Sequence, residues 1–157
     1  REKADRQLRT IWKDVRHLSH ALMPPRFEKI ALDEAVKCYV QTIVDDAECQ
    51  VKLNIDGSFD WSKLSPQQAY DTYRIIQEAV SNAMKHGNPT SLVISLQVVG
   101  QEVSLLVSNE GEGSSVDAQP YLGIGVETMQ RRAASIGAKL SINYEHGKYA
   151  VALTYRK

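Results

Sequence analysis

The fold of this chain is decided by the stretch Tyr73–His86, which reads YRIIQEAVSNAMKH. Apolar side chains recur in it and just upstream at steps of three and four residues, as in a helix with one face in a core. They are Ala69, Tyr73, Ile76, Val80 and Ala83. Glu78, Asn82 and Lys85 lie at i, i+4 and i+7, so they share a second face of the same helix.

That second face suits a particular chemistry. A carboxylate, an amide oxygen and an ammonium group along one ridge can serve a hydrated Mg²⁺ and the phosphates that it carries. The alternative is a solvated helix surface with an incidental Glu–Lys spacing. On this helix alone, both interpretations stay open.

The composition is that of a soluble domain with a core: 157 residues, 43% of them hydrophobic. Nineteen basic and nineteen acidic residues balance, which argues against nucleic acid as a partner. No apolar run is long enough to span a bilayer, and we expect no direct membrane contact. Cys38 and Cys49 lack zinc-ligand spacing and disulfide density, so we expect reduced thiols in the cytoplasm. Because the chain opens on Arg1, we expect a piece of a longer protein, which could itself be membrane-anchored.

The N-terminal segment carries an apolar seam with alternating spacings of three and four residues. Its members are Leu8, Ile11, Val15, Leu18 and Leu22. The pattern predicts a bundle-type helix that stops at Pro24-Pro25. A single seam cannot bury itself, so we expect partner helices from elsewhere in the protein or from a second copy.

Turn and cap signals divide the rest of the chain. Helices are expected over 31–46, from Ser65-Pro66 to Gly87, and from Gly123 to Gly137. Strands are expected over 49–55, 91–98, 102–108, 139–144 and 148–155. The segment from Asn109 to Leu122 is expected to be a functional or mobile loop. Because most neighbouring strands are hairpin-linked, the sequence predicts an α+β fold: a two-layer α/β sandwich with a mixed, mostly antiparallel sheet and helices on one face.

Two glycine pairs add to the polar helix face. Asn109-x-Gly111-x-Gly113 follows a predicted strand, where glycines let the backbone approach a flat base or sugar. Gly123-x-Gly125 opens a predicted helix, where free N–H groups and the helix dipole favour a phosphate. Either pair alone is weak, because turns and caps need glycine anyway. Together with the polar helix they favour a nucleotide site.

Three segments in this order, RIIQEAVSNAMKH, VSNEGEG and GIGVETMQRR, resemble the N box and two glycine boxes of the GHKL (Bergerat-fold) ATPases. The chain looks most like the ATP-binding catalytic domain of bacterial two-component sensor histidine kinases. The segment DVRHLSHALMPPRFEKIALDEAV is similar to the end of the second dimerisation helix in the subfamily of nitrate and desaturase sensors. The resemblance implies a partial dimerisation helix over 1–25 and an ATP-binding domain over 26–157.

The resemblance also implies roles for residues in the three boxes. Asn82 would ligate Mg²⁺, Glu78 would polarise a water or the metal shell, and Lys85 and His86 would neighbour the phosphates. The remaining nucleotide-binding positions would be Asn109, Gly111 and Gly113 at the adenine, and Gly123, Ile124, Gly125 and Val126 at the phosphates. The segment 112–122 would be a short ATP lid.

Two residues depart from the family pattern. Asn109 stands where the family usually has an aspartate that accepts a hydrogen bond from the adenine amino group. An amide oxygen can accept that bond but without charge assistance, at a cost on the order of 1 kcal/mol. Thr128 stands where the second glycine box usually has a further glycine.

The leading hypothesis is a histidine-kinase catalytic domain that uses ATP and Mg²⁺. Its parent would be a homodimer through the dimerisation helices and would pass the phosphoryl group from a histidine to a response regulator receiver domain. The family's phosphoacceptor is a histidine followed directly by an acidic residue, and no such pair occurs here. We therefore expect the acceptor to lie on a helix outside this chain. The alternatives are a degenerate, non-catalytic GHKL module and a GHKL serine kinase of the anti-sigma type.

Overall fold

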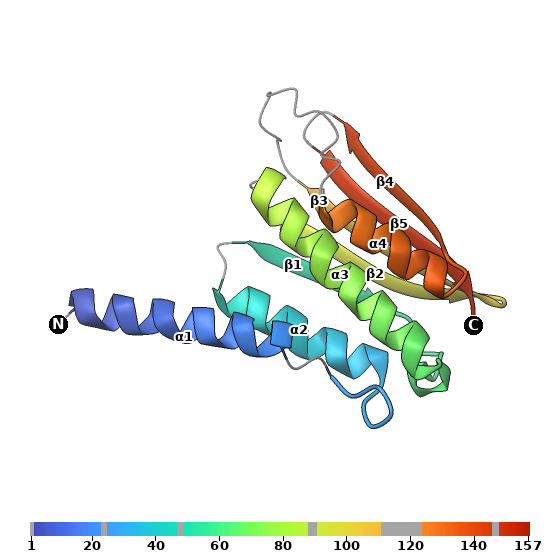
Figure 1. Ribbon diagram of the computed structural model, residues 1–157, viewed down its shortest axis with the longest axis horizontal. Helices are drawn as coiled ribbons and strands as arrows, with labels where there is room; N and C mark the ends of the chain where they lie inside the picture. The colour runs from blue at the N-terminus through green and yellow to red at the C-terminus, as the bar shows by residue number, and fades with distance from the viewer. Residues whose placement is uncertain (1, 23–24, 47–48, 88–90, 111–123, 146–147) are drawn as a thin grey trace.

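The computed structural model describes residues 2–22, 25–46, 49–87, 91–110, 124–145 and 148–157 (Figure 1). The α-helices are α1 (Glu2–Leu22), α2 (Leu32–Asp46), α3 (Pro66–Gly87) and α4 (Ile124–Ser135), with a short 3₁₀ helix at Trp61–Lys63. The strands are β1 (Gln50–Ile55), β2 (Ser91–Val99), β3 (Glu102–Glu110), β4 (Lys139–Glu145) and β5 (Lys148–Arg156).

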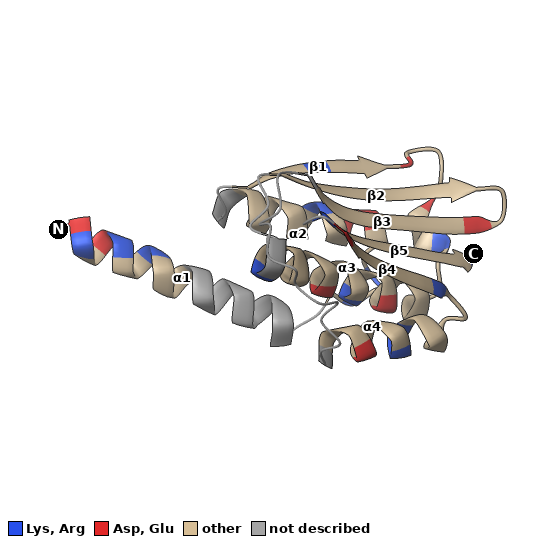
Figure 2. Ribbon diagram, turned by 90° about the horizontal axis from the view of Figure 1, so that it is seen from above, with Lys and Arg blue, Asp and Glu red and all other residues tan. Residues whose placement is uncertain are grey.

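The five strands form one sheet in the order β1-β2-β3-β5-β4. β1 pairs with β2 in parallel, and every other neighbouring pair is antiparallel. Helices α2, α3 and α4 lie side by side on one face of the sheet, and α1 extends beyond the layered domain (Figures 1 and 2). The predicted two-layer α/β sandwich, with a mixed and mostly antiparallel sheet, is confirmed.

The core lies between the helices and the sheet. Every second residue of the three central strands is buried there, because side chains alternate between the two faces of a strand. The buried positions are Leu92, Ile94 and Leu96 on β2, Val103, Leu105 and Val107 on β3, and Tyr149, Val151, Leu153 and Tyr155 on β5. The opposite side of these strands is only partly covered, and Leu106 there is 40% exposed.

Helix α3 runs through the middle of the helical layer, between α2 and α4 (Figure 1). It begins as predicted: Pro66 is its first residue, and Ser65 precedes it as the N-cap. The Ser65 hydroxyl accepts a hydrogen bond from the Gln68 N–H, and the Gln68 side chain accepts one from the Ser65 N–H, both at 3.1 Å. This reciprocal capping box fixes where the helix starts.

Local signals also predicted where α4 ends, but not where β3 ends. Gly137 has a φ of +64°, and the N–H of Ala138 donates to the Ala133 carbonyl at 2.8 Å, closing the C-terminal turn that the sequence indicated. The prediction that Asn109 begins a loop was wrong, because β3 continues to Glu110. Pairing of Glu110 with Ser91 on β2 extends the strand past the polar residues.

The N-terminal seam is helical as predicted, within α1. Leu8 and Ile11 of the seam are 55% and 57% exposed and their neighbour Trp12 is 66% exposed, so this part of the seam lies open to solvent. Its burial by partner helices remains a prediction. Within the described ranges, none of the helices has the length and apolar character needed to cross a membrane.

The buried phenol of Tyr155 makes the fold sensitive to alkaline pH. Burial raises its pKa from 10.0 to about 12, against the lowering effect of its hydrogen bond with Thr72. The folded state holds the phenol neutral, so the stabilisation is complete below pH 10 and is lost between pH 10 and about 12. We expect the unfolding free energy, measured by urea unfolding, to fall by about 2 kcal/mol across that window because of this phenol. Tyr155→Phe should make the decline shallower, and an unchanged slope would contradict the assignment.

Candidate functional site

Residues from all three boxes converge at one end of the molecule. The C-terminal end of α3, the end of β3, the start of β5 and the N-terminal end of α4 lie together there (Figure 1). They bring Asn82, Asn109, Tyr149 and Gly125 to this end of the fold. The arrangement follows from the sheet order, which places β5 directly beside β3 although α4 and β4 separate them in the sequence.

Tyr149 connects the two asparagines. Its main-chain N–H donates a hydrogen bond to Oδ1 of Asn109 at 2.5 Å, beside the last paired residues of β3 and β5. Its phenol oxygen accepts a hydrogen bond from Nδ2 of Asn82 at 3.4 Å. Tyr149, Asn109 and Asn82 are only 7%, 4% and 9% exposed. The N box on α3 and the first glycine box on β3 therefore meet at a residue of β5.

Glu78 lies against the first turn of α4. A Cβ atom on Gly125 would overlap a carboxylate oxygen of Glu78 and lie 2.9 Å from its Cδ. The Glu78 carboxylate can lie this close to the backbone of α4 because residue 125 has no side chain, and a Cβ atom there would require the carboxylate to move. The second glycine box is thereby held beside the N box.

The charge of Glu78 reaches the phenol of Tyr149. Burial raises the pKa of Tyr149, the hydrogen bond from Asn82 lowers it, and the Glu78 carboxylate raises it. A negative charge favours the neutral phenol, which fits a carboxylate close to the hydroxyl. Glu78, Asn82 and Tyr149 thus form one polar group between α3, α4 and the sheet.

The donor atoms present fit Mg²⁺ held in a particular way. Glu78 and Asn82 offer hard oxygen atoms, and the described residues contain no cluster of three or more His, Cys, Asp and Glu side chains that could hold a metal by themselves. Mg²⁺ in nucleotide sites is commonly bound by one or two protein oxygens together with phosphates and water. This donor set is compatible with a cation that arrives with a nucleotide.

The other predicted site residues divide into three groups. Lys85 is exposed on the last turns of α3. Val126, in the first turn of α4, is partly buried against the core. His86 and Ile124 are described only as helical backbone. Gly111, Gly113 and Gly123 lie outside the described residues, as does the predicted lid 112–122.

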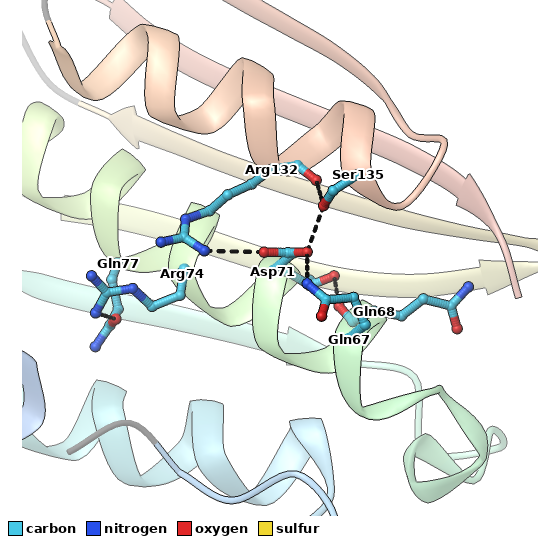
Figure 3. A network of polar contacts seen from close by, with 8 residues as sticks. Gln67, Gln68, Asp71, Arg74, Gln77, Arg132 and Ser135 are labelled. Atoms are coloured by element: carbon cyan, nitrogen blue, oxygen red, sulfur yellow. Dashed lines mark hydrogen bonds and ion pairs between the residues drawn. The ribbon is translucent and has the colours of Figure 1, made fainter.

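A buried charge fastens α4 to α3 nearer the N-terminal end of α3, away from the site (Figure 3). Asp71 on α3 is 2% exposed, and its carboxylate accepts hydrogen bonds from Arg132 at 3.1 Å and Ser135 at 2.7 Å, both on α4. Gln67, one turn earlier on α3, donates a further bond to the same carboxylate. The guanidinium of Arg132 also lies 5.3 Å from the centre of the Tyr70 ring.

Neither the role of Tyr149 nor the cluster of Asp71 with Gln67, Arg132 and Ser135 was predicted from the sequence. The signals were present: Tyr149 occupies an inward position in the alternating pattern of its strand, and Asp71 precedes Glu78 and Asn82 on one ridge of α3 at steps of seven and four residues. What was absent from the sequence is the pairing of α4 and β5 with α3 and β3.

Comparison with known proteins agrees with this fold. Residues 68–154 match the family described as Histidine kinase-, DNA gyrase B-, and HSP90-like ATPase, which is more than half of the chain. The chain therefore belongs to this family of ATPases. The match confirms the predicted GHKL domain, and the relatives found by sequence are themselves named as sensor kinases, a NarQ homolog of Haemophilus influenzae among them.

The curated relatives are sensor kinases from bacteria. The chain is 24% identical to the histidine-protein kinase/phosphatase UhpB of Salmonella typhimurium, over 93% of this chain and 29% of that protein. It is 27% identical to the oxygen sensor histidine kinase NreB of Staphylococcus carnosus, over 83% of this chain and 37% of that protein. It therefore spans about a third of these relatives.

Solved structures show the same fold. The histidine kinase domain of the blue-light activated kinase from Erythrobacter litoralis EL346 superposes with a TM-score of 0.64 at 14% identity, covering 81% of this chain and 61% of that one. The Acinetobacter baumannii histidine kinase AdeS gives a TM-score of 0.58 at 16% identity, with 80% and 62% coverage.

Gly125→Ala tests the close contact between the N box and α4. We expect it to lower the free energy of unfolding by up to about 1 kcal/mol, because the new methyl group must displace the carboxylate end of the flexible Glu78 side chain. Combining it with Glu78→Ala should remove most of that cost, and urea unfolding of the single and double variants measures the coupling. Gly57→Ala is the matched control, since nothing lies within 4 Å of a Cβ there. Additive effects of the two substitutions would contradict the contact.

Arg132→Met tests the clamp between α3 and α4. It leaves the Asp71 carboxylate buried without its cation, and we expect a loss of about 2–3 kcal/mol in unfolding free energy. Adding Asp71→Asn should recover part of the loss, because the amide is neutral. Arg131→Met, at an exposed position of the same helix, should change stability by less than about 0.5 kcal/mol. Equal stability of the two arginine variants would show that the pair contributes nothing.

Proposed function

We propose that this domain binds ATP with Mg²⁺ and is the catalytic domain of a two-component sensor histidine kinase. The γ-phosphoryl group would go to a histidine on a helix outside these residues, and then to an aspartate of a response regulator. One observation carries the proposal: Asn82 and Asn109, from two separate boxes, meet at one residue while Glu78 lies against the second glycine box. A core that needed only packing would not gather these polar groups at one end.

Each residue has a role in this proposal. Asn82 offers its amide oxygen to Mg²⁺, since its Nδ2 is the atom bonded to Tyr149. Glu78 orders a metal-bound water or holds part of the metal shell. Asn109 reads the base, and exposed Lys85 at the end of α3 provides a mobile positive charge for the phosphates.

The proposed chemistry is mainly positioning. When bound, Mg²⁺ would neutralise charge on the phosphate oxygens. Residues of α3 and the first turn of α4 would hold the nucleotide so that the terminal phosphate faces the incoming histidine. Phosphoryl transfer needs little covalent help from the protein, so a site built from amides, one carboxylate and helix N–H groups is sufficient.

The partners are part of the proposal. A receiver domain would be the onward phosphoacceptor, and homodimerisation would bury the exposed seam residues Leu8 and Ile11 of α1. The relatives named as sensor kinases support both, and the cytoplasm is the compartment in which ATP and a receiver domain would be met.

A second function is favoured by one observation. Asn82 and Asn109 are buried and bonded to Tyr149 in this structure, which suits a domain that keeps the fold without using nucleotide. Such a domain would be a non-catalytic regulatory or interaction module. Asn109 and Thr128, which depart from the family pattern, point the same way.

Calorimetric titration with ADP and a non-hydrolysable ATP analogue, with and without Mg²⁺, separates the two functions. For the kinase domain we expect Mg²⁺-dependent binding that Asn82→Ala weakens about tenfold or more, equivalent to at least about 1.4 kcal/mol. Asn54→Ala, an exposed asparagine on β1, is the matched control and should bind as the parent chain does. The parent chain is tested together with Tyr149→Thr and Tyr149→Phe, which remove the phenol bonded to Asn82. If none of them gives heat or thermal stabilisation at millimolar nucleotide, the non-catalytic function stands.

A further inference from the structure

We propose that the side chain of Tyr149 is an internal occupant of the nucleotide site, which must move aside before nucleotide binds. Tyr149 then sets the affinity of the domain. This inference rests on the proposed function, because it concerns the same site.

The residues proposed to contact nucleotide are buried in this structure. Asn82 and Asn109 should turn polar atoms toward the space that a nucleotide enters. In this structure they are 9% and 4% exposed, and each directs one amide atom at Tyr149. What they contact is another part of the same chain.

Tyr149 reaches from one of these asparagines to the other. Its main-chain nitrogen lies at Asn109, at the end of β3, and its phenol oxygen lies at Asn82, on α3. The side chain therefore spans from the residue proposed to read the base to the residue proposed to hold the metal. A nucleotide that touches both asparagines has to use the same space.

The hydrogen bond that holds the ring of Tyr149 in place is weak. The hydrogen bond from Asn82 is 3.4 Å long, near the upper limit for such bonds, and it is the one hydrogen bond that the phenol makes within the described parts of the chain. The stronger bond, at 2.5 Å, belongs to the main chain and survives a rotation of the side chain. The ring can thus leave while Asn109 keeps its partner.

A ring that occupies the site reduces the measured affinity. The apparent dissociation constant is the intrinsic one divided by the fraction of molecules in the open state. If fewer than about one molecule in ten is open, removing the ring should strengthen binding about tenfold or more. Threonine is a suitable replacement, because it keeps β propensity at this strand position while removing the ring.

Tyr155 provides a matched control. It lies on the same strand and the same face, is 3% exposed, and its phenol is bonded to Thr72 near the other end of α3. Substituting it removes an equally buried tyrosine without touching the site. General loosening of the core should therefore act alike at both positions, whereas occupancy of the site involves only Tyr149.

The experiment measures dissociation constants for ADP and a non-hydrolysable ATP analogue, with Mg²⁺, in the whole chain. The variants are Tyr149→Thr, Tyr149→Phe, Tyr155→Thr and Tyr155→Phe, each first checked for folding by circular dichroism and thermal unfolding. We expect Tyr149→Thr to bind at least tenfold more tightly than the parent, and Tyr149→Phe a few-fold more tightly. The Tyr155 variants should stay within twofold. If a threonine variant does not fold, the two phenylalanine variants carry the comparison.

The outcomes distinguish this inference from the function on which it rests. Binding by the parent that Tyr149→Thr leaves unchanged or weakens would overturn the role of Tyr149 and keep the kinase domain. Equal gains at Tyr149 and Tyr155 would also overturn it, since they would reflect a loosened core. Binding by Tyr149→Thr where the parent shows none would support both, and no binding by any folded variant would overturn both.

Discussion

The buried carboxylate of Asp71 is the constraint on which the helical layer depends. A charge that is 2% exposed needs partners of its own, and its arginine and serine partners both belong to α4. Helix α4 must therefore lie along the ridge of α3 that carries Asp71. Glu78 lies further along the same ridge, so the start of α4 arrives beside it, where glycine at position 125 leaves the room required. The clamp and the site are two ends of one contact between helices.

Most of the fold could be predicted because its signals are local. The N-cap at Ser65, the glycine that ends α4 at Gly137 and the alternation along the strands depend on neighbours in the sequence, and each was found where expected. The predicted end of β3 was wrong because it depends on contacts that are not local. Asn109 and the glycines after it have the composition of a loop, but pairing with β2 and a side-chain bond to β5 keep Asn109 in the strand. Those partners are far away in the sequence.

The candidate site was likewise predictable only where its residues are close in the sequence. Helical spacing alone was enough to predict that Glu78 and Asn82 share a face, because both lie on one helix. The connection through Tyr149 could not be predicted, since it requires the register of β3 against β5 and the depth of α3 above the sheet. Any tyrosine at an inward position would look like core in the sequence. Only the arrangement in space shows that this one meets both asparagines.

The parallel pairing of β1 with β2 has a mechanical consequence. The chain leaves β1, passes through α3 and returns as the adjacent strand β2, so both ends of α3 are tied to neighbouring strands of one ladder. Asn82 therefore moves with the sheet, and displacing it would strain the pairing of β1 with β2. Helix α4 lies in the sequence between β3 and β4, which are not neighbours in the sheet, and it meets α3 through the Asp71 cluster and the contact of Glu78 with Gly125. Of the two helices that border the site, α3 is therefore the one fixed between neighbouring strands.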